Sequence, residues 1–168
     1  MRTTNRSTNG IQLGLIGALL LGAAACGSGS GISGDKGEPG AKEIAQKLKS
    51  DPATFAALKP SESDLKKLFE DSAVAPMQTY VEKMYGELKG VDMKEDASDI
   101  HCYESEAIKA WKDVEHLPGG YKRLGDKLKP GVVACSFKSG SNSWDGLMWI
   151  DGKWFFVAKP FRAITEKS

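Results

Sequence analysis

The dipeptide Asp151-Gly152, which lies between the apolar runs 144–150 and 153–158, sets the tightest limit on the fold of this chain. A type I′ turn needs positive φ at both central residues, and Asp-Gly is among the few dipeptides that accept it readily. A two-residue loop also fixes the register of the two strands. The sequence therefore predicts an antiparallel hairpin with these facing pairs: Ile150 with Lys153, Trp149 with Trp154, Met148 with Phe155, and Leu147 with Phe156.

Both faces of the predicted hairpin are apolar. The residues of the two faces are Leu147, Trp149, Trp154 and Phe156 on one, and Met148, Ile150, Phe155 and Val157 on the other. An antiparallel hairpin with one wet face alternates apolar with polar residues, so each face of this one needs a cover. Helices of the chain can cover one face, and the 161–164 tail, a ligand or another protein chain can cover the second. Trp149 and Trp154 are therefore candidate ligand- or partner-contacting residues, with core packing as the alternative.

The residues before the hairpin change from helical to alternating periodicity. Helices are expected over 42–49, from Pro52 to Pro60, and from Ser61. The strongest helix is expected from Pro76 to Gly90 because its apolar residues recur at helical spacing. Its predicted apolar stripe consists of Met77, Tyr80, Val81, Met84, Tyr85 and Leu88.

Further along the chain, we expect a strand over 99–103, helices beginning at Ser105 and near Tyr121, and a strand over 132–139. Helices followed by an antiparallel sheet define the α+β class. Residues 41–168 hold all 14 aromatic residues of the chain, which predicts a single domain there.

The hairpin with its Asp151-Gly152-Lys153-Trp154 turn, together with the strand before it, resembles the nuclear-transport-factor-two-like (cystatin-like) superfamily. The resemblance covers about a quarter of the chain and implies a curved sheet around a pocket. Members of that superfamily include isomerases, cyclases and non-catalytic binding domains, so the resemblance leaves the function open.

The N-terminus has the pattern of an export signal. Arg2 and Arg6 precede an apolar run from Leu13 to Ala25, and no acidic residue intervenes. Thirteen helical residues span about 20 Å, which is too short for the roughly 30 Å of bilayer hydrocarbon. A positive start, a short apolar run and a small-residue end together predict a signal peptide.

The segment Ala23-Ala24-Ala25-Cys26 resembles the lipobox of bacterial lipoproteins. That resemblance implies cleavage between Ala25 and Cys26 and attachment of lipid to the Cys26 sulfur, which would place the protein on the exported side of a bacterial cell envelope. Two or three acyl chains hold a protein stably on a membrane. Gly27 stands where an aspartate often retains lipoproteins in an inner membrane, so the outer membrane is favoured if two membranes exist.

Residues 27–40 are mostly Gly and Ser, with Ile32 as their only large apolar residue. Such a segment buries too little surface to offset the entropy of ordering, so it predicts a flexible tether. The expected organisation is a signal peptide over 1–25, a lipidated cysteine and tether over 26–40, and one domain over 41–168.

The remaining cysteines, Cys102 and Cys135, can form a disulfide if the protein is exported to an oxidising compartment. Two separate buried thiols are the alternative, because only geometry distinguishes the two cases.

The sequence carries few signs of chemistry. A nucleophilic Cys102 paired with His116 stays open, but His101 and Cys102 are neighbours on a strand and point to opposite faces. No C-x-x-C or H-x-x-x-H pair predicts a metal site, no phosphate-binding or hydrolase motif predicts a cofactor, and a net charge of +1 does not predict nucleic acid as a partner.

Three classes of function remain. The first is a membrane-anchored envelope lipoprotein with a non-enzymatic domain that binds another envelope protein or has a structural role. The second is a domain that binds a small apolar ligand in a pocket. The third is an isomerase, cyclase or hydrolase, which needs a perturbed acid, histidine or tyrosine in such a pocket.

Overall fold

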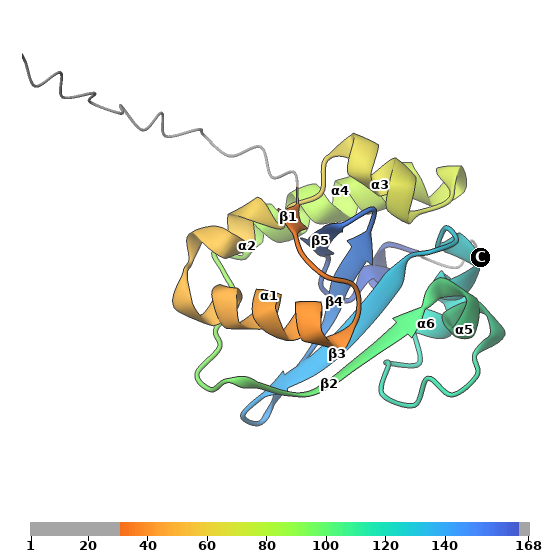
Figure 1. The fold of residues 1–168 in the computed structure, drawn as a ribbon. Coiled ribbons are helices and arrows are strands. Elements are labelled where there is room, and N and C mark those ends of the chain that lie inside the picture. Colours follow the sequence, from red (N-terminus) through yellow and green to blue (C-terminus); the bar gives the residue numbers. More distant parts are fainter. Residues whose placement is uncertain (1–30, 165–168) are drawn as a thin grey trace, which may run out of the picture.

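The computed structural model describes residues 31–164, which form one α+β domain. Its helices are α1 (Glu38–Ser50), α2 (Ala53–Ala57), α3 (Glu62–Leu68), α4 (Asp71–Glu87), α5 (Ser105–Ala110) and α6 (Tyr121–Leu124), with 3-10 turns η1 (Gly125–Lys127) and η2 (Pro160–Ala163). Its strands are β1 (Ile32–Ser33), β2 (Ala97–Glu104), β3 (Val133–Ser139), β4 (Asn142–Ile150) and β5 (Lys153–Phe156). The strands pair antiparallel in the order β1-β5-β4-β3-β2, with the helices packed around the sheet (Figure 1).

The β4–β5 hairpin has the predicted register. Trp149 lies opposite Trp154, and the other three predicted pairs are also present. Asp151 and Gly152 have φ values of 50° and 78°, as a type I′ turn requires. The prediction of this hairpin from its turn residues is confirmed.

Both apolar faces of the hairpin are covered by the chain itself. On one face, Trp154 and Phe156 belong to a buried cluster that includes residues of α1 and α2. On the other face, Met148 and Phe155 belong to a cluster that includes residues of α3, α4, α5 and α6. Phe161, Ala163 and Ile164 of the tail also pack on the second cluster. Core packing, rather than a ligand or a second chain, therefore covers this hairpin.

The strand β4 contains a bulge at Gly146. The register between β3 and β4 shifts there, because Leu147 lies opposite Cys135 whereas Asp145 lies opposite Ser136. Gly146 has a φ of 98°, and a Cβ at this position would lie 1.9 Å from the carbonyl oxygen of Val157. Only glycine fits this close approach. The extra residue reverses the alternation of β4, so Trp144 packs with the α1–α2 side while Asp145 lies near Tyr121.

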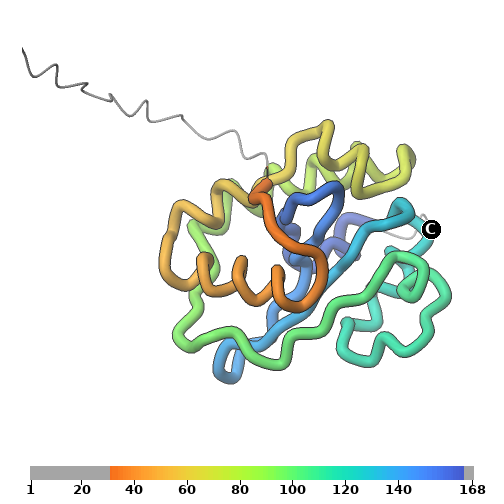
Figure 2. Tube along the Cα trace, viewed as in Figure 1, coloured from red at the N-terminus to blue at the C-terminus, as the bar shows by residue number. Residues whose placement is uncertain are grey.

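The segment before α1 is part of the domain, which corrects the prediction that all of 27–40 is a flexible tether. Ile32 and Ser33 pair with Trp154 and Lys153 of β5. Gly40 is buried in the first turn of α1. Figure 2 shows this segment running beside the last strand. Residues 31–40 bury little apolar surface of their own. They are held on the domain by backbone pairing with β5 and by hydrogen bonds from two tryptophans, which are described below.

The long helix α4 begins five residues earlier than predicted, at Asp71. Ala73 and Val74 are buried and extend the apolar stripe upstream, so burial outweighs the hydrogen bond that Pro76 cannot donate inside the helix. At the other end, the helix stops at Glu87. Leu88 therefore leaves the predicted stripe and is 40% exposed.

None of the helices within residues 31–164 combines the length and the hydrophobicity that crossing a membrane requires.

Candidate functional site

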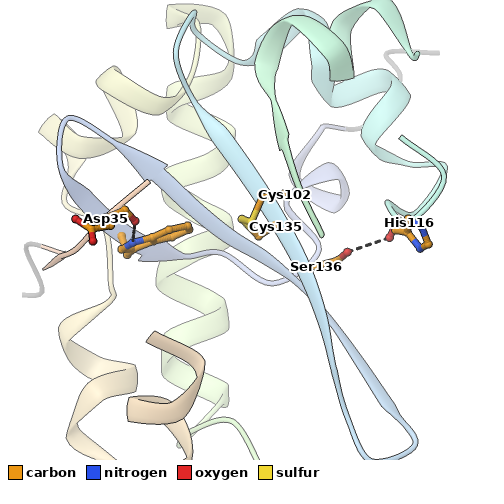
Figure 3. Close-up of a disulfide and its surroundings, with 6 residues drawn as sticks. Asp35, Cys102, His116, Cys135 and Ser136 are labelled. Atoms are coloured by element: carbon orange, nitrogen blue, oxygen red, sulfur yellow. Dashed lines mark hydrogen bonds between the residues drawn. A yellow bond between two sulfur atoms is a disulfide. The ribbon is translucent and has the colours of Figure 1, made fainter. Parts of the chain in front are cut away.

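The structure joins Cys102 of β2 to Cys135 of β3 in a disulfide across directly opposed positions (Figure 3). Of the two alternatives that the sequence leaves open, this is the bonded one. A disulfide sulfur is not a free thiolate, so the hypothesis of a nucleophilic Cys102 paired with His116 is wrong for this state of the chain.

Trp149 and Trp154 hold the N-terminal segment on the sheet. The indole N–H of Trp154 donates to the carbonyl oxygen of Asp35 at 3.0 Å, and that of Trp149 donates to the carbonyl oxygen of Gly34 at 2.9 Å. The Lys36 ammonium lies 5.7 Å from the centre of the Trp149 ring. Trp154 is completely buried, so of the two alternatives that the sequence leaves open, the structure places this residue in the core.

A large groove within the described residues lies where α4 meets the start of β4 and the segment after β5, and we call it the Trp144 groove. Its cavity volume is about 610 Å³. The groove is lined by Tyr80, Lys83, Met84, Glu87, Leu88, Trp144, Ala158, Lys159 and Arg162. A smaller hollow of about 320 Å³ shares Trp144, Ala158 and Lys159 with the groove and extends it toward Asp92 and Asn142. The two hollows together form a site lined by one helix, two strand ends and the η2 turn.

The groove combines an apolar lining with positive charge. Met84, Leu88 and the Trp144 ring supply apolar surface, and Leu88 is the large apolar residue most exposed among those described. Lys159 and Arg162 are exposed, and neither forms an ion pair with another residue of the described range. Apolar surface beside unpaired cations suits an amphipathic ligand with an anionic group.

A buried carboxylate lies beside this positive charge. Oδ1 of Asp145 accepts hydrogen bonds from the backbone N–H of Lys159 at 3.0 Å and from the Tyr121 hydroxyl at 3.3 Å. Burial raises the pKa of the Asp145 carboxyl above its usual range, although these two donors and the nearby Lys159 and Arg162 charges oppose the rise. Lys159 itself has a φ of 50°, which its bond to Asp145 helps to hold.

The hydroxyl groups of two tyrosines near the groove, Tyr80 and Tyr85, also form hydrogen bonds with the backbone. The Tyr80 hydroxyl donates to the carbonyl oxygen of Ala158 at 2.7 Å, and the Tyr85 hydroxyl donates to that of Phe156 at 2.9 Å. Burial raises the pKa of both tyrosines, so both remain protonated donors at neutral pH. The indole N–H of Trp144, in contrast, is buried and has no acceptor in the described part of the chain.

A second cluster lies beside the C-terminal half of β3, where Asp99, His101 and His116 meet. Oδ1 of Asp99 lies 2.8 Å from Nε2 of His101, and the two imidazole rings stack with centroids 3.5 Å apart. Lys138 pairs with Oδ2 of Asp99 at 2.6 Å. Hydrogen bonds from Lys138 and His101 lower the pKa of Asp99 to about 2. Figure 3 shows Ser136 directed toward His116, on the side of β3 opposite the disulfide.

Sequence reasoning missed both sites. The groove draws on α4, β4 and η2, which are far apart in the chain, and the cluster joins β2 to a loop beyond α5. One signal was present for the groove, because an isolated glycine within a strand pattern, here Gly146, indicates a bulge that redirects its neighbours. The predicted processing residues, Ala25 and Cys26, lie outside the described residues.

Comparisons with family profiles, with curated proteins and with solved structures find no significant match to this chain.

Proposed function

We propose that this chain is a lipid-anchored protein of the bacterial cell envelope, and that its domain is a non-enzymatic binding domain for a small amphipathic anion. The ligand binds in the Trp144 groove. The observation that carries the proposal is the apolar lining of that groove beside Lys159 and Arg162, two exposed cations that form no ion pair within the described range.

The fold supports an anchor close to the domain. The described chain enters the sheet at β1, and only four residues separate Cys26 from Gly31. The five residue steps from Cys26 to Gly31 span at most about 18 Å when fully extended. A lipid on Cys26 would therefore hold the domain against the membrane surface, much nearer than a tether ending at residue 40 would.

The groove supports a ligand with an apolar body and an anionic end. Burial of apolar ligand surface on Met84, Leu88 and the Trp144 ring contributes about 25 cal/mol per Å². The anionic end has Lys159 and Arg162 within the same groove.

The polar contacts favour binding over catalysis. The Asp145 carboxylate and the Tyr80 hydroxyl line the two hollows and have shifted pKa values, and each is hydrogen-bonded to a backbone group of the site. A general acid or base needs to reach the proton it transfers. These contacts indicate that the two groups shape the site instead.

A pair of probes with the same tail and opposite charge tests the groove. We expect octanoate to bind the purified chain in a calorimetric titration and octyltrimethylammonium to bind much more weakly. The double variant Lys159→Gln/Arg162→Gln should weaken octanoate binding about tenfold, roughly 1.4 kcal/mol. Lys112→Gln/Lys122→Gln, which removes two exposed positive charges outside the groove, is the matched control. Equal binding of both probes, or no effect of the double variant, would contradict the proposal.

Two substitutions at one position separate shape from hydrogen bonding. Trp144→Phe keeps an aromatic ring and removes the N–H, whereas Trp144→Ala removes the apolar surface. We expect octanoate affinity to fall further in Trp144→Ala than in Trp144→Phe, with Trp111→Phe as the control because Trp111 lies outside the groove.

Intact mass spectrometry of membrane-extracted protein tests the anchor. The expected product begins at Cys26 and carries acyl mass, while Cys26→Ser stays unprocessed and loses that mass. The Cys102→Ser/Cys135→Ser variant should remain lipidated. A native product that retains Met1 and carries no acyl mass would contradict the anchor and leave the groove proposal to its own test.

A further inference from the structure

Three donor side chains from two separate segments meet at one point on the surface. Asp99 and His101 belong to β2, and His116 belongs to the loop between α5 and α6. One ligand atom from each of the three lies within 4.8 Å of the others. A hollow of about 220 Å³ at this point is lined by all three residues together with Ser136 and Lys138.

The backbone of β2 is shaped to bring Asp99 back toward His101. The register between β2 and β3 shifts between Ser98 and His101, and Asp99 has a φ of 51°, a left-handed conformation that is rare for residues other than glycine. Strained backbone of this kind persists where the surrounding structure over-determines it, and it is concentrated at functional sites. Here its result is a carboxylate oxygen 2.8 Å from His101 Nε2.

The two supporting segments are held firmly. The Cys102–Cys135 disulfide ties the residue after His101 to β3. The Ser136 hydroxyl donates to the carbonyl oxygen of His116 at 3.0 Å, and Leu117 next to it is buried. Donor groups on fixed backbone need little rearrangement to converge on a ligand.

We propose that Asp99, His101 and His116 bind one divalent transition-metal ion of the Zn²⁺ type. Two imidazole nitrogens and a carboxylate oxygen are the donors that Zn²⁺ and its neighbours prefer, whereas Mg²⁺ and Ca²⁺ prefer oxygen alone. Bonds of about 2.0–2.2 Å at tetrahedral angles place neighbouring donor atoms about 3.3–3.6 Å apart, so the Asp99–His101 pair, at 2.8 Å, needs to open by only about half an ångström. Three protein ligands leave a coordination position for water or another molecule.

Binding requires one side chain to move. The two rings are nearly parallel, at 9°, so their in-plane lone pairs run side by side rather than toward one ion. His116 is exposed, and rotation of its ring brings the nitrogen toward Asp99 and His101. Lys138 can keep its bond to Oδ2 of Asp99 and orient the carboxylate while Oδ1 binds the ion. Its positive charge nevertheless opposes the ion.

Calorimetric titration of the full chain, purified without a histidine tag, tests the site with Zn²⁺ alone. We expect one ion per chain, no saturable binding of Mg²⁺, and at least tenfold weaker Zn²⁺ binding in His116→Ala. Asp126→Asn removes an exposed carboxylate outside the cluster and should leave the affinity unchanged. Lys138→Gln should bind more tightly. The proposal is wrong if Zn²⁺ binding does not saturate below about 0.1 mM or if His116→Ala binds Zn²⁺ as tightly as the wild type. The stacked rings of His101 and His116 would then be a surface contact that binds no metal.

A second measurement needs no variant and covers the case in which one fails to fold. The chain has only two histidines, so the imidazole resonances in an NMR spectrum belong to His101 and His116. Both sets should shift together with Zn²⁺ and stop shifting at one equivalent. Movement of one histidine alone would overturn a site that uses both.

Discussion

The β4–β5 hairpin and the Asp99–His101–His116 cluster both occupy the same sheet, yet they depend on the sequence in different ways. In the hairpin, the interacting residues are close in the chain and a two-residue turn fixes their register. In the cluster, a bulge in β2 meets a loop that follows α5, and no short pattern links the two. Local order is therefore visible as periodicity, whereas a site assembled across elements depends on tertiary packing.

The largest expected loss of stability comes from the central pair of the hairpin, Trp149 and Trp154, whose two members should differ in their contribution. Trp154→Ala should lower the free energy of unfolding by about 3–5 kcal/mol because the ring is completely buried. Trp149→Ala, its cross-strand partner, should cost about 1–2 kcal/mol because that ring is only partly buried. Urea unfolding of both variants measures the difference. Equal losses would mean that the turn, and not burial, determines the stability of this pair.

The second prediction concerns the link between the cluster's strand and the rest of the sheet. Cys102 and Cys135 are 33 positions apart, so removing their bond should destabilise the domain by about 3–4 kcal/mol on the chain-entropy estimate. Urea unfolding with and without a reductant checks this. The Cys102→Ser/Cys135→Ser variant is the control, and its stability should not respond to the reductant. If the free energy of unfolding of the wild type is also unchanged by the reductant, the disulfide does not contribute to stability.

Asp145 gives a smaller effect with a defined pH dependence. Asp145→Ala should cost about 2 kcal/mol because the Lys159 N–H and the Tyr121 hydroxyl lose their acceptor, and Asp145→Asn should cost less because an amide oxygen can still accept. The pKa of Asp145 is raised in the folded chain, so the folded state binds more protons than the unfolded state just above pH 3.8. The stability that this group contributes should therefore fall as pH rises from that value to the folded pKa.

Chemical unfolding of the wild type and Asp145→Asn across this acidic range isolates the contribution of the carboxyl group. The difference between the two proteins should move in favour of Asp145→Asn as pH rises. A difference that stays constant with pH would show that the carboxyl titrates as it does in the unfolded chain.

The smallest expected effect lies in the turn. Gly152→Ala should cost about 1–2 kcal/mol from backbone conformation alone, because φ is 78° and no atom lies within 4 Å of the added Cβ. Gly119→Ala adds a Cβ to open space without a positive φ and should change stability little. Thermal unfolding of both variants makes the comparison. Equal stability losses in the two variants would contradict the claim that the turn conformation at Gly152 determines the register of the hairpin.

Particular residues show which features of the fold could be predicted from the sequence. Asp151-Gly152 predicted the register, and the alternation on either side predicted two buried faces, because those signals act between neighbours. The predicted start of α4 at Pro76 is five residues too late, because the helix continues upstream through the proline where Ala73 and Val74 are buried. Neither the Trp144 groove nor the histidine cluster could be predicted, since each depends on which distant segments pack together.

The most direct test of the proposed function is an NMR titration of the isotopically labelled chain with octanoate. The account predicts that the indole N–H signal of Trp144 and the backbone signals of Lys159 and Arg162 shift together and saturate, while those of Trp111 and His116 stay in place. Shifts spread over the whole surface, or centred away from Trp144, would contradict a ligand-binding groove at this position.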